Sequence, residues 1–450
     1  MEVGGFDWNL AGAFTGGVVI LLLLILLLKW NAFVSLLISS IVVGWLSGMP
    51  GAVIIDTIKS GMGGTLGFVS IVIGLGAIFG EILRASGSTE KLSAKMLSYF
   101  GIERSPIALS ISGFLIAIPV FFDVAFIILI PVLYALQKKT GKSLLYFAIP
   151  LLASLAITHA FIPPTPGPIA VADILGADLG RVIGFGILVG LPTTWISGII
   201  YGKFIANRIH ADVPKEVEVE TENEGKNPPL GIIVSLIALP IALILFNTLT
   251  KMLYPSNTSE FLMLIQFLGN PIIALIISVI FAWYLLGQRM GFTKNELQRL
   301  SIKALGPAGI IILITGAGGV FKQMLIETGA GEMMAIQLSN SNLSPLLLAY
   351  LIALIVRVIQ GSATVAMITA AGIMAPILLS INLDATEISL MVLIIAAGAS
   401  GFSHVNDSGF WLVNRYLGLS EVNTLKSWTV MTGILSVFSA ALILILSVLI

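Results

Sequence analysis

Residues 145–178 read LYFAIPLLASLAITHAFIPPTPGPIAVADILGAD. The stretch is apolar and long enough to cross a bilayer, which takes roughly 17–25 residues. Four of the six residues from Pro163 to Pro168 are prolines. A helix cannot continue through them, because proline lacks the N–H group and clashes with the preceding turn. Irregular backbone at membrane depth is tolerated where it lines a cavity or is packed inside protein, so the stretch predicts a broken membrane helix at an internal site.

The composition of the whole chain is that of a polytopic membrane protein. Of its 450 residues, 57% are hydrophobic and 10% are charged, against about 25% charged residues in soluble domains. These values exclude a soluble enzyme and a disordered chain. Lys+Arg and Asp+Glu are equal at 23 each, which leaves no basic excess for nucleic acid. With no cysteine and three histidines, we expect no cofactor and no bound metal.

Apolar stretches along the chain predict ten crossings and two re-entrant hairpins. The crossings are expected near 12–28, 30–47, 66–83, 145–178, 182–202, 230–250, 263–286, 306–325, 388–414 and 428–450. The stretches 106–136 and 345–381 are interrupted by polar residues. Both flanks of the first carry Lys and Arg, and both flanks of the second carry Asp and Glu. By the positive-inside rule, the first hairpin enters from the cytoplasm, the second enters from outside, and both termini face the periplasm.

The two halves of the chain resemble each other. Six residues recur 242 positions later, namely Gly74, Gly76, Phe79, Leu83, Gly87 and Glu90 as Gly316, Gly318, Phe321, Leu325, Gly329 and Glu332. The polar stretch 207–229 divides the chain into a first repeat, 1–206, and a second repeat, 230–450. We interpret 207–229 as a cytoplasmic linker. Each repeat would contain about five crossings and one hairpin, and an odd number of crossings inverts the second copy. The expected fold is an all-α membrane protein with an inverted repeat and midplane broken helices, typical of secondary transporters.

Four polar interruptions mark the expected site, two in each half. They are Phe121–Asp123, Thr158–Pro168, Gln360–Thr364 with Arg357 just before it, and Ser403–Ser408. A helix that begins at such a break presents unpaired N–H groups and the positive end of its dipole. Four such ends at one point would favour an anion. The pattern therefore predicts a small carboxylate as the substrate.

The polar motifs resemble those of the gluconate permease (GntP) family. The resemblance covers the chain through FFDV at 121–124, SLLY at 143–146, TH with the proline run at 158–168, ILGADLG at 174–180, QGSATVA at 360–366 and SHVNDSGFW at 403–411. It implies a proton-coupled importer of gluconate or a related sugar acid in the bacterial inner membrane. Some members take D-serine or other small hydroxy acids. The wider ion-transporter superfamily implies a homodimer that works by an elevator-like movement.

Two charged residues are the main functional candidates. Asp123 is an ionisable group at a hairpin tip, and such groups inside a membrane are functional by default. We expect it to carry the coupling proton, with His159 as the other candidate for that role. Arg357 can hold a substrate carboxylate with its planar fork of donors. The alternative is that Asp123 and Arg357 form a structural ion pair, which substrate could replace once Asp123 is protonated.

The remaining candidates offer hydroxyl, amide, imidazole or backbone groups for a polyol. The expected substrate-binding residues besides Arg357 are Phe122, Thr158, His159, Thr165, Gly361, Ser362, Thr364, His404, Asn406, Asp407 and Ser408. Their oxygens could also bind Na⁺, or could cap the broken helix ends. Asp123 and Thr165 depart from the family pattern, which has Glu and His at these places. These departures leave the particular sugar acid open.

Other classes of function were weighed against transport. Residues 398–401, Gly-Ala-Ser-Gly, match the short motif of serine intramembrane proteases. Such an enzyme needs a base within hydrogen-bond reach of Ser400, and an inverted repeat has no use in that scheme. A Na⁺-coupled carboxylate or D-serine symporter remains the main alternative. A passive channel is disfavoured because two hairpins at a midplane site suit alternating access better than an open pore.

Overall fold

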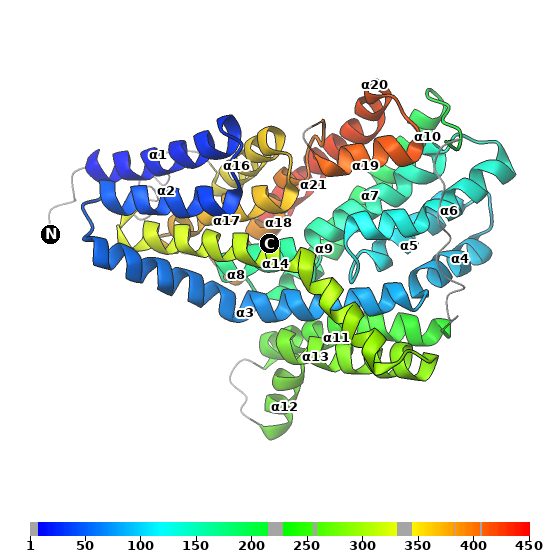
Figure 1. Ribbon diagram of the computed structural model, residues 1–450, viewed down its shortest axis with the longest axis horizontal. Coiled ribbons are helices and arrows are strands. Elements are labelled where there is room, and N and C mark those ends of the chain that lie inside the picture. Colours follow the sequence, from blue (N-terminus) through cyan, green and yellow to red (C-terminus); the bar gives the residue numbers. More distant parts are fainter. Residues whose placement is uncertain (1–7, 215–227, 255–258, 331–343, 382, 406) are drawn as a thin grey trace.

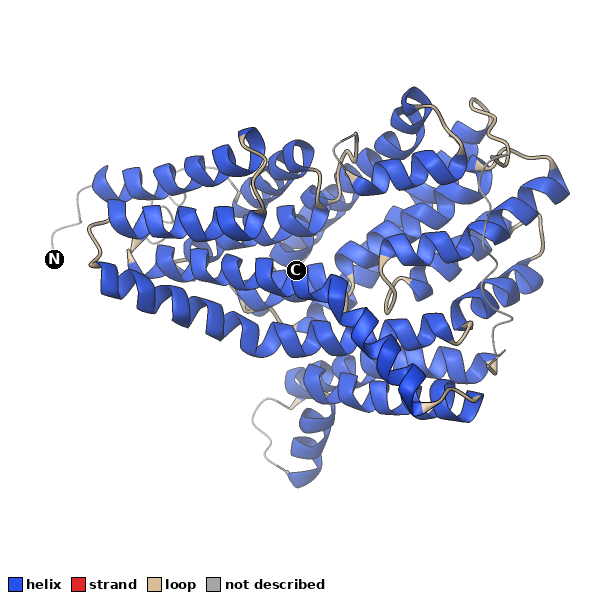
Figure 2. Ribbon diagram, viewed as in Figure 1, coloured by secondary structure: helices blue, strands red, loops and turns tan. Residues whose placement is uncertain are grey.

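Helices make up all the regular structure that the chain shows. The computed structural model describes residues 8–214, 228–254, 259–330, 344–381, 383–405 and 407–450. Within these ranges every regular element is a helix, which confirms the all-α prediction (Figure 2). Seven of the helical segments are long and apolar enough to cross a membrane. The part of the linker at 215–227 and residue Asn406 lie outside the described residues.

The helices of the first half run in an unbroken order from residue 8 (Figure 1). They are α1 (Trp8–Leu22), α2 (Ala32–Leu46), α3 (Gly51–Ala85), α4 (Ser88–Phe100), α5 (Ser105–Ile116), α6 (Phe122–Thr140), α7 (Leu145–Phe161), α8 (Pro166–Leu175), α9 (Leu179–Thr194) and α10 (Tyr201–Ala206). π-helical turns extend α1 and join α9 to α10, at Leu23–Leu27 and Trp195–Ile200.

The regular structure of the second half is also helical throughout its described residues. Its described helices are α11 (Leu230–Leu253), α12 (Glu260–Leu268), α13 (Pro271–Ala282), α14 (Lys294–Glu327), α16 (Pro345–Gln360), α17 (Ala363–Leu379), α18 (Ala385–Ala399), α19 (Ser408–Leu417), α20 (Glu421–Thr424) and α21 (Val430–Leu449). A π-helical and a 3₁₀ turn, Trp283–Gly287 and Gln288–Met290, follow α13. Another π-helical turn, Leu425–Thr429, joins α20 to α21.

The spacing between corresponding helices matches the repeat seen in the sequence. Both α8 and α19 have ten residues, and they begin and end 242 positions apart. Each ends at a glycine in the left-handed conformation, Gly176 with φ +73° and Gly418 with φ +60°. A residue with a side chain is strained in that conformation. α8 and α19 thus agree in length and spacing, while the repeat as a whole and the inverted orientation of the second half stay predictions.

Two long helices form the spine of the molecule. α3 and α14 have 35 and 34 residues and pack against each other (Figure 1). A Cβ atom added at Gly61 would lie 2.8 Å from the Cα atom of Val320, so the two backbones touch there. Both helices begin well before the predicted crossings at 66–83 and 306–325, because the helix continues through polar, glycine and charged residues that precede the apolar span.

Each of the four stretches that the sequence marks as interrupted is a pair of helices. The stretches predicted as hairpins are α5–α6 and α16–α17, and the predicted broken crossings are α7–α8 and α18–α19. α16 and α17 pack against each other, whereas α5 packs on α7 and α4, and re-entry into the membrane stays a prediction. Each hairpin contacts the broken helix of the other half, since α6 packs on α19 and α17 packs on α8. This crosswise packing brings the four polar interruptions toward the centre of the molecule.

Candidate functional site

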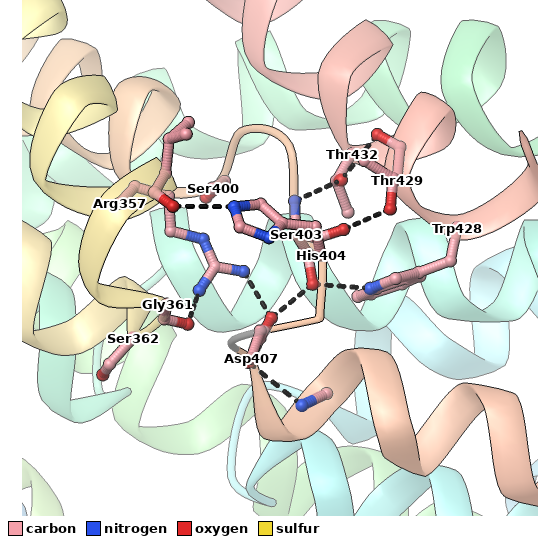
Figure 3. Close-up of polar contacts among 12 residues, drawn as sticks. Arg357, Gly361, Ser362, Ser400, Ser403, His404, Asp407, Trp428, Thr429 and Thr432 are labelled. Carbon is pink, nitrogen blue, oxygen red and sulfur yellow. Dashed lines mark hydrogen bonds and ion pairs between the residues drawn. The ribbon is translucent and has the colours of Figure 1, made fainter. Parts of the chain in front are cut away.

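The break in the second half holds a buried arginine. Arg357 lies in the last turn of α16, and its residue is only 4% exposed. The helix stops at Gly361, whose φ of +89° turns the chain into α17. Arg357 donates one Nη to the Gly361 carbonyl oxygen and the other, at 2.5 Å, to Oδ2 of Asp407 (Figure 3). Its Nε is buried and has no hydrogen-bond partner among the described residues.

Asp407 is the acceptor at the centre of this network. It is the N-cap of α19, where its Oδ1 accepts from the backbone N–H of Gly409 at 3.0 Å. Its Oδ2 accepts from Arg357 and from the hydroxyl of Ser403. Ser403 in turn accepts from the indole N–H of Trp428 at 2.6 Å (Figure 3). The carboxylate is therefore held by a charge-assisted bond, a cap and a side-chain relay, each of which fixes its position.

Further contacts tie the loop between α18 and α19 to its neighbours. The Ser403 backbone accepts from Thr429 Oγ1 and donates to Thr432 Oγ1, the latter at 3.0 Å. A ring nitrogen of His404 lies 2.7 Å from the carbonyl oxygen of Val358, so this histidine bonds to α16. The loop is irregular, and its described backbone groups are satisfied in part by these side chains and in part by backbone bonds such as that from the Asp407 N–H to the His404 carbonyl oxygen at 2.8 Å.

The described ion pairs correct one interpretation of the sequence. Arg357 pairs with Asp407, and not with Asp123. Asp123 lies in the first turn of α6, near enough to Asp407 for the two carboxylates to repel each other. The arginine is therefore bonded to one of the two acidic residues, and the other lies on α6, which packs on α19.

The break in the first half is apolar by comparison. Thr158 and His159 close α7, and the Thr158 hydroxyl and His159 Nδ1 are buried without a hydrogen-bond partner among the described residues. The hydroxyl of Thr165 donates to the carbonyl oxygen of Ile162 at 2.6 Å. His159, Thr165 and Phe121 line one small pocket between α3, the first hairpin tip and α8. Of the two unpaired side chains, His159 lines this pocket and Thr158 lies next to it in the chain.

Four helix N-termini converge around these two breaks. Phe121 of the α6 tip and Thr165 of the α8 N-cap line the same pocket. A Cβ atom added at Gly167 of α8 would lie 3.0 Å from the sulfur of Met367 in α17. Asp407, the N-cap of α19, bonds to Arg357 in the last turn of α16, just before α17 begins, and α19 packs on α6. The arrangement presents the positive ends of four dipoles to one region.

Hydroxyls at the second hairpin tip have local roles. The Ser362 hydroxyl caps α17 by accepting from the N–H of Val365 at 3.3 Å. Thr364 lies in the first turn of α17 and is half-buried, whereas Ser408 lies in the first turn of α19 and is exposed. The predicted site residue Asn406 falls outside the described part of the chain. For Ser362 the structure thus contains the capping role that was the alternative to substrate binding.

One aromatic contact was not predicted. The ring of Phe122 lies 5.6 Å from the ring of Trp428, measured between centroids. The first hairpin tip thus abuts the residue that holds Ser403. No periodicity or spacing links positions 122 and 428, because the contact depends on how α6 and the start of α21 pack across the two halves.

The proposed protease chemistry has no support in this geometry. The hydroxyl of Ser400 is buried and donates to the carbonyl oxygen of Ala396 at 2.7 Å. That bond is the usual way for a serine to satisfy its hydroxyl within a helix. Among the described residues it has no bond to a histidine or to another base.

The fold and the site define a multi-pass membrane transporter, with a buried arginine and two carboxylates at broken helix ends. The family model described as GntP family permease matches residues 8–449. The chain belongs to the GntP permease family. It is therefore a transporter and not an enzyme.

Named relatives and a solved structure agree with this assignment. The chain is 37% identical over 425 residues to the low-affinity gluconate transporter of Escherichia coli (strain K12), covering 94% of this chain and 95% of that one. It is 37% identical over 423 residues to the gluconate permease of Pseudomonas aeruginosa, covering 93% of each. The crystal structure of the Alcanivorax borkumensis YdaH transporter has a similar fold, with a TM-score of 0.63, 14% identity, and 87% and 86% of the chains covered.

Proposed function

We propose that this protein imports gluconate or a closely related sugar acid across the bacterial inner membrane together with a proton. The observation that carries the proposal is the buried Arg357, held by Asp407 beside a second carboxylate, Asp123. Two relatives that match nearly the full length of the chain are named for gluconate. A planar arginine fork is the side chain that best recognises a carboxylate.

The geometry suggests how an anion and a proton are coupled. Asp407 occupies one Nη of Arg357, so a substrate carboxylate must share or replace that bond. Adding a third carboxylate beside Asp123 and Asp407 is costly while both are charged. Protonation of Asp123 removes one of the negative charges and makes room for the substrate. Binding of the anion and of the proton then favour each other.

The substrate hydroxyls have candidate partners in the first half. His159 Nδ1 and the Thr158 hydroxyl are buried and unpaired among the described residues. The four helix N-termini provide N–H groups and a favourable potential for an anion. We further propose that the hairpins and broken helices move together against the other helices, as in an elevator, and that the protein works as a homodimer.

Uptake by the purified protein tests the proposal. Proteoliposomes would receive labelled gluconate with an acid-outside pH gradient, and separately with a Na⁺ gradient. Uptake driven by the pH gradient alone is expected, with unlabelled sugar acids, glycerate and D-serine as competitors. Uptake driven only by Na⁺ would favour the Na⁺-coupled alternative. If neither gradient drives gluconate uptake but a competitor is transported, the substrate is a different acid.

A further inference from the structure

A charged cluster lines a cleft on the far side of the first hairpin tip. The cleft has a volume of about 270 Å³ and lies between α3, α14 and the turn that joins α5 to α6. Its charged lining consists of Glu81 and Arg84 from α3 and Lys303 from α14. Nothing in the proposed central site uses these three residues.

The cluster is built around one carboxylate and two cations. Arg84 grips Glu81 with two parallel bonds, Nε to Oε2 at 2.7 Å and Nη2 to Oε1 at 2.6 Å. Lys303 Nζ lies 3.8 Å from the same Oε1. The Glu81 side chain is 12% exposed and that of Lys303 is 70% exposed. The fork therefore already holds a carboxylate in the geometry that a ligand carboxylate would adopt.

Only the hairpin tip separates this cleft from the central site. Ala77, Pro119, Val120 and Phe121 line both the cleft and the small pocket that contains His159 and Thr165. At Gly80 of α3, an added Cβ atom would lie 1.8 Å from the carbonyl oxygen of Pro119, so the helix touches the turn. A small shift of this turn would join the two spaces.

We propose that Arg84 and Lys303 form a second carboxylate-binding site on the path of the substrate, which Glu81 occupies when no substrate is there. The inference rests on the proposed function, since it takes the transported sugar acid as the ligand. Glu81 competes with the substrate for the two cations. The competition keeps affinity low at this site, so that the acid passes on rather than being trapped. The site lies toward the membrane face that we expect to be cytoplasmic.

The test measures affinity separately from each face. Inside-out and right-side-out membrane vesicles carry out gluconate exchange, with a saturating concentration on one face and a varied concentration on the other. Lys303→Gln removes one exposed cation and is expected to raise KM on the face that carries Arg84 about three- to fivefold. KM on the opposite face should not change. Lys303→Arg should restore the wild-type value.

Glu81→Gln should change KM in the direction opposite to that of Lys303→Gln. Removing the competing carboxylate should lower KM on the same face by about threefold and slow the maximal exchange rate, because the substrate is held longer. Lys59→Gln is the matched control. Lys59 lies on the same helix and pairs with Asp56 at 3.3 Å, but both side chains are more than 70% exposed and do not line the cleft.

The outcomes separate this inference from the proposed function. If wild-type vesicles exchange gluconate but Lys303→Gln and Glu81→Gln shift KM in the same direction, or equally on both faces, the second site is wrong and the transport function stands. If wild-type vesicles exchange neither gluconate nor any competing acid, the proposed function fails and the second site fails with it.

Discussion

The two broken helices of this transporter occupy equivalent positions in the repeat and differ in chemistry. Thr165 is the N-cap residue of α8 and Asp407, 242 positions later, is the N-cap of α19. Thr165 bonds only to the nearby backbone of Ile162 among the described contacts, whereas Asp407 binds an arginine, a serine and its own helix end. The N-termini of α8 and α19 thus correspond in position, but only α19 has a charged N-cap residue.

This difference separates two ways of stabilising a break inside a membrane. In the first half, prolines end the helix and remove some of the N–H groups that a break would otherwise leave, and many of the surrounding side chains are buried and apolar. In the second half, where residues 400–407 contain no proline, a network of side chains satisfies the loop. The first break is suited to a rigid part of the site. The second is suited to binding, because its side-chain hydrogen bonds can be exchanged for bonds to a ligand.

The largest effect is expected when the ion pair at the second, charged break is removed. Arg357→Gln leaves the carboxylate of Asp407 buried without its cation, which costs about 3 kcal/mol or more of stability. Gluconate uptake should fall by at least about 100-fold, because the guanidinium group that we propose to bind the substrate carboxylate is also lost. Uptake in proteoliposomes and thermal unfolding in detergent measure the two effects.

A double variant separates stability from binding. Arg357→Gln combined with Asp407→Asn removes both charges, so much of the thermal stability should return while uptake stays lost. Arg289→Lys, at an exposed turn after α13, is the control. Full uptake by the double variant would show that this ion pair is structural and that the charge difference between the breaks has no role in binding.

The next effect concerns the carboxylate that lies near the network without bonding to Arg357. Asp123→Asn cannot exchange a proton, so it should lose uphill uptake but keep exchange of preloaded gluconate. One pH unit supplies about 1.4 kcal/mol per proton, so accumulation for one proton per substrate should fall from about tenfold to none. Asp56→Asn, on an exposed part of α3, should accumulate normally. Accumulation by Asp123→Asn under a pH gradient would contradict the assignment of Asp123 as the proton carrier.

The breaks themselves could be predicted from the sequence because their signals are local. Prolines 163, 164, 166 and 168 lie where α7 ends at Phe161 and α8 begins at Pro166. The second break, expected around Ser403–Ser408, lies between Ala399 and Ser408. Polar residues within an apolar stretch must line a cavity or be packed inside the protein. The positions of the breaks can therefore be found in a single sequence.

The partner of Arg357 could not be predicted in the same way. Asp123 and Asp407 are both acidic residues at breaks, and the sequence offers no rule to choose between them. The choice depends on how the last turn of α16 faces the loop after α18, which is a matter of tertiary packing. The contact of Phe122 with Trp428 was missed for the same reason.

A smaller effect is expected when the relay behind Asp407 is weakened. Trp428→Phe keeps a ring against Phe122 but removes the N–H that bonds to Ser403 at 2.6 Å. Loss of one such bond is worth about 1 kcal/mol, so uptake should fall about three- to tenfold. Trp428→Ala should lose more, because the packing is lost too. Trp45→Phe is the control, because Trp45 is 74% exposed, and it should leave uptake unchanged. If Trp428→Phe also leaves uptake unchanged, the bond from Trp428 to Ser403 has no role in transport.

The smallest effect is expected on the uncharged side of the comparison. Thr165→Val keeps the shape of the buried N-cap and removes only the bond to the Ile162 carbonyl. Uptake should fall less than about threefold, since a local hydrogen bond of this kind contributes about 0.5 kcal/mol, the low end of the usual range. Thr165→Asp is the informative partner, because none of the side chains lining its pocket is a lysine or an arginine. An unpaired carboxylate there should lower thermal stability and uptake together. If Thr165→Val instead abolishes uptake while the protein stays folded, the Thr165 hydroxyl binds the substrate. Both breaks would then contribute to substrate binding, although only the second one is charged.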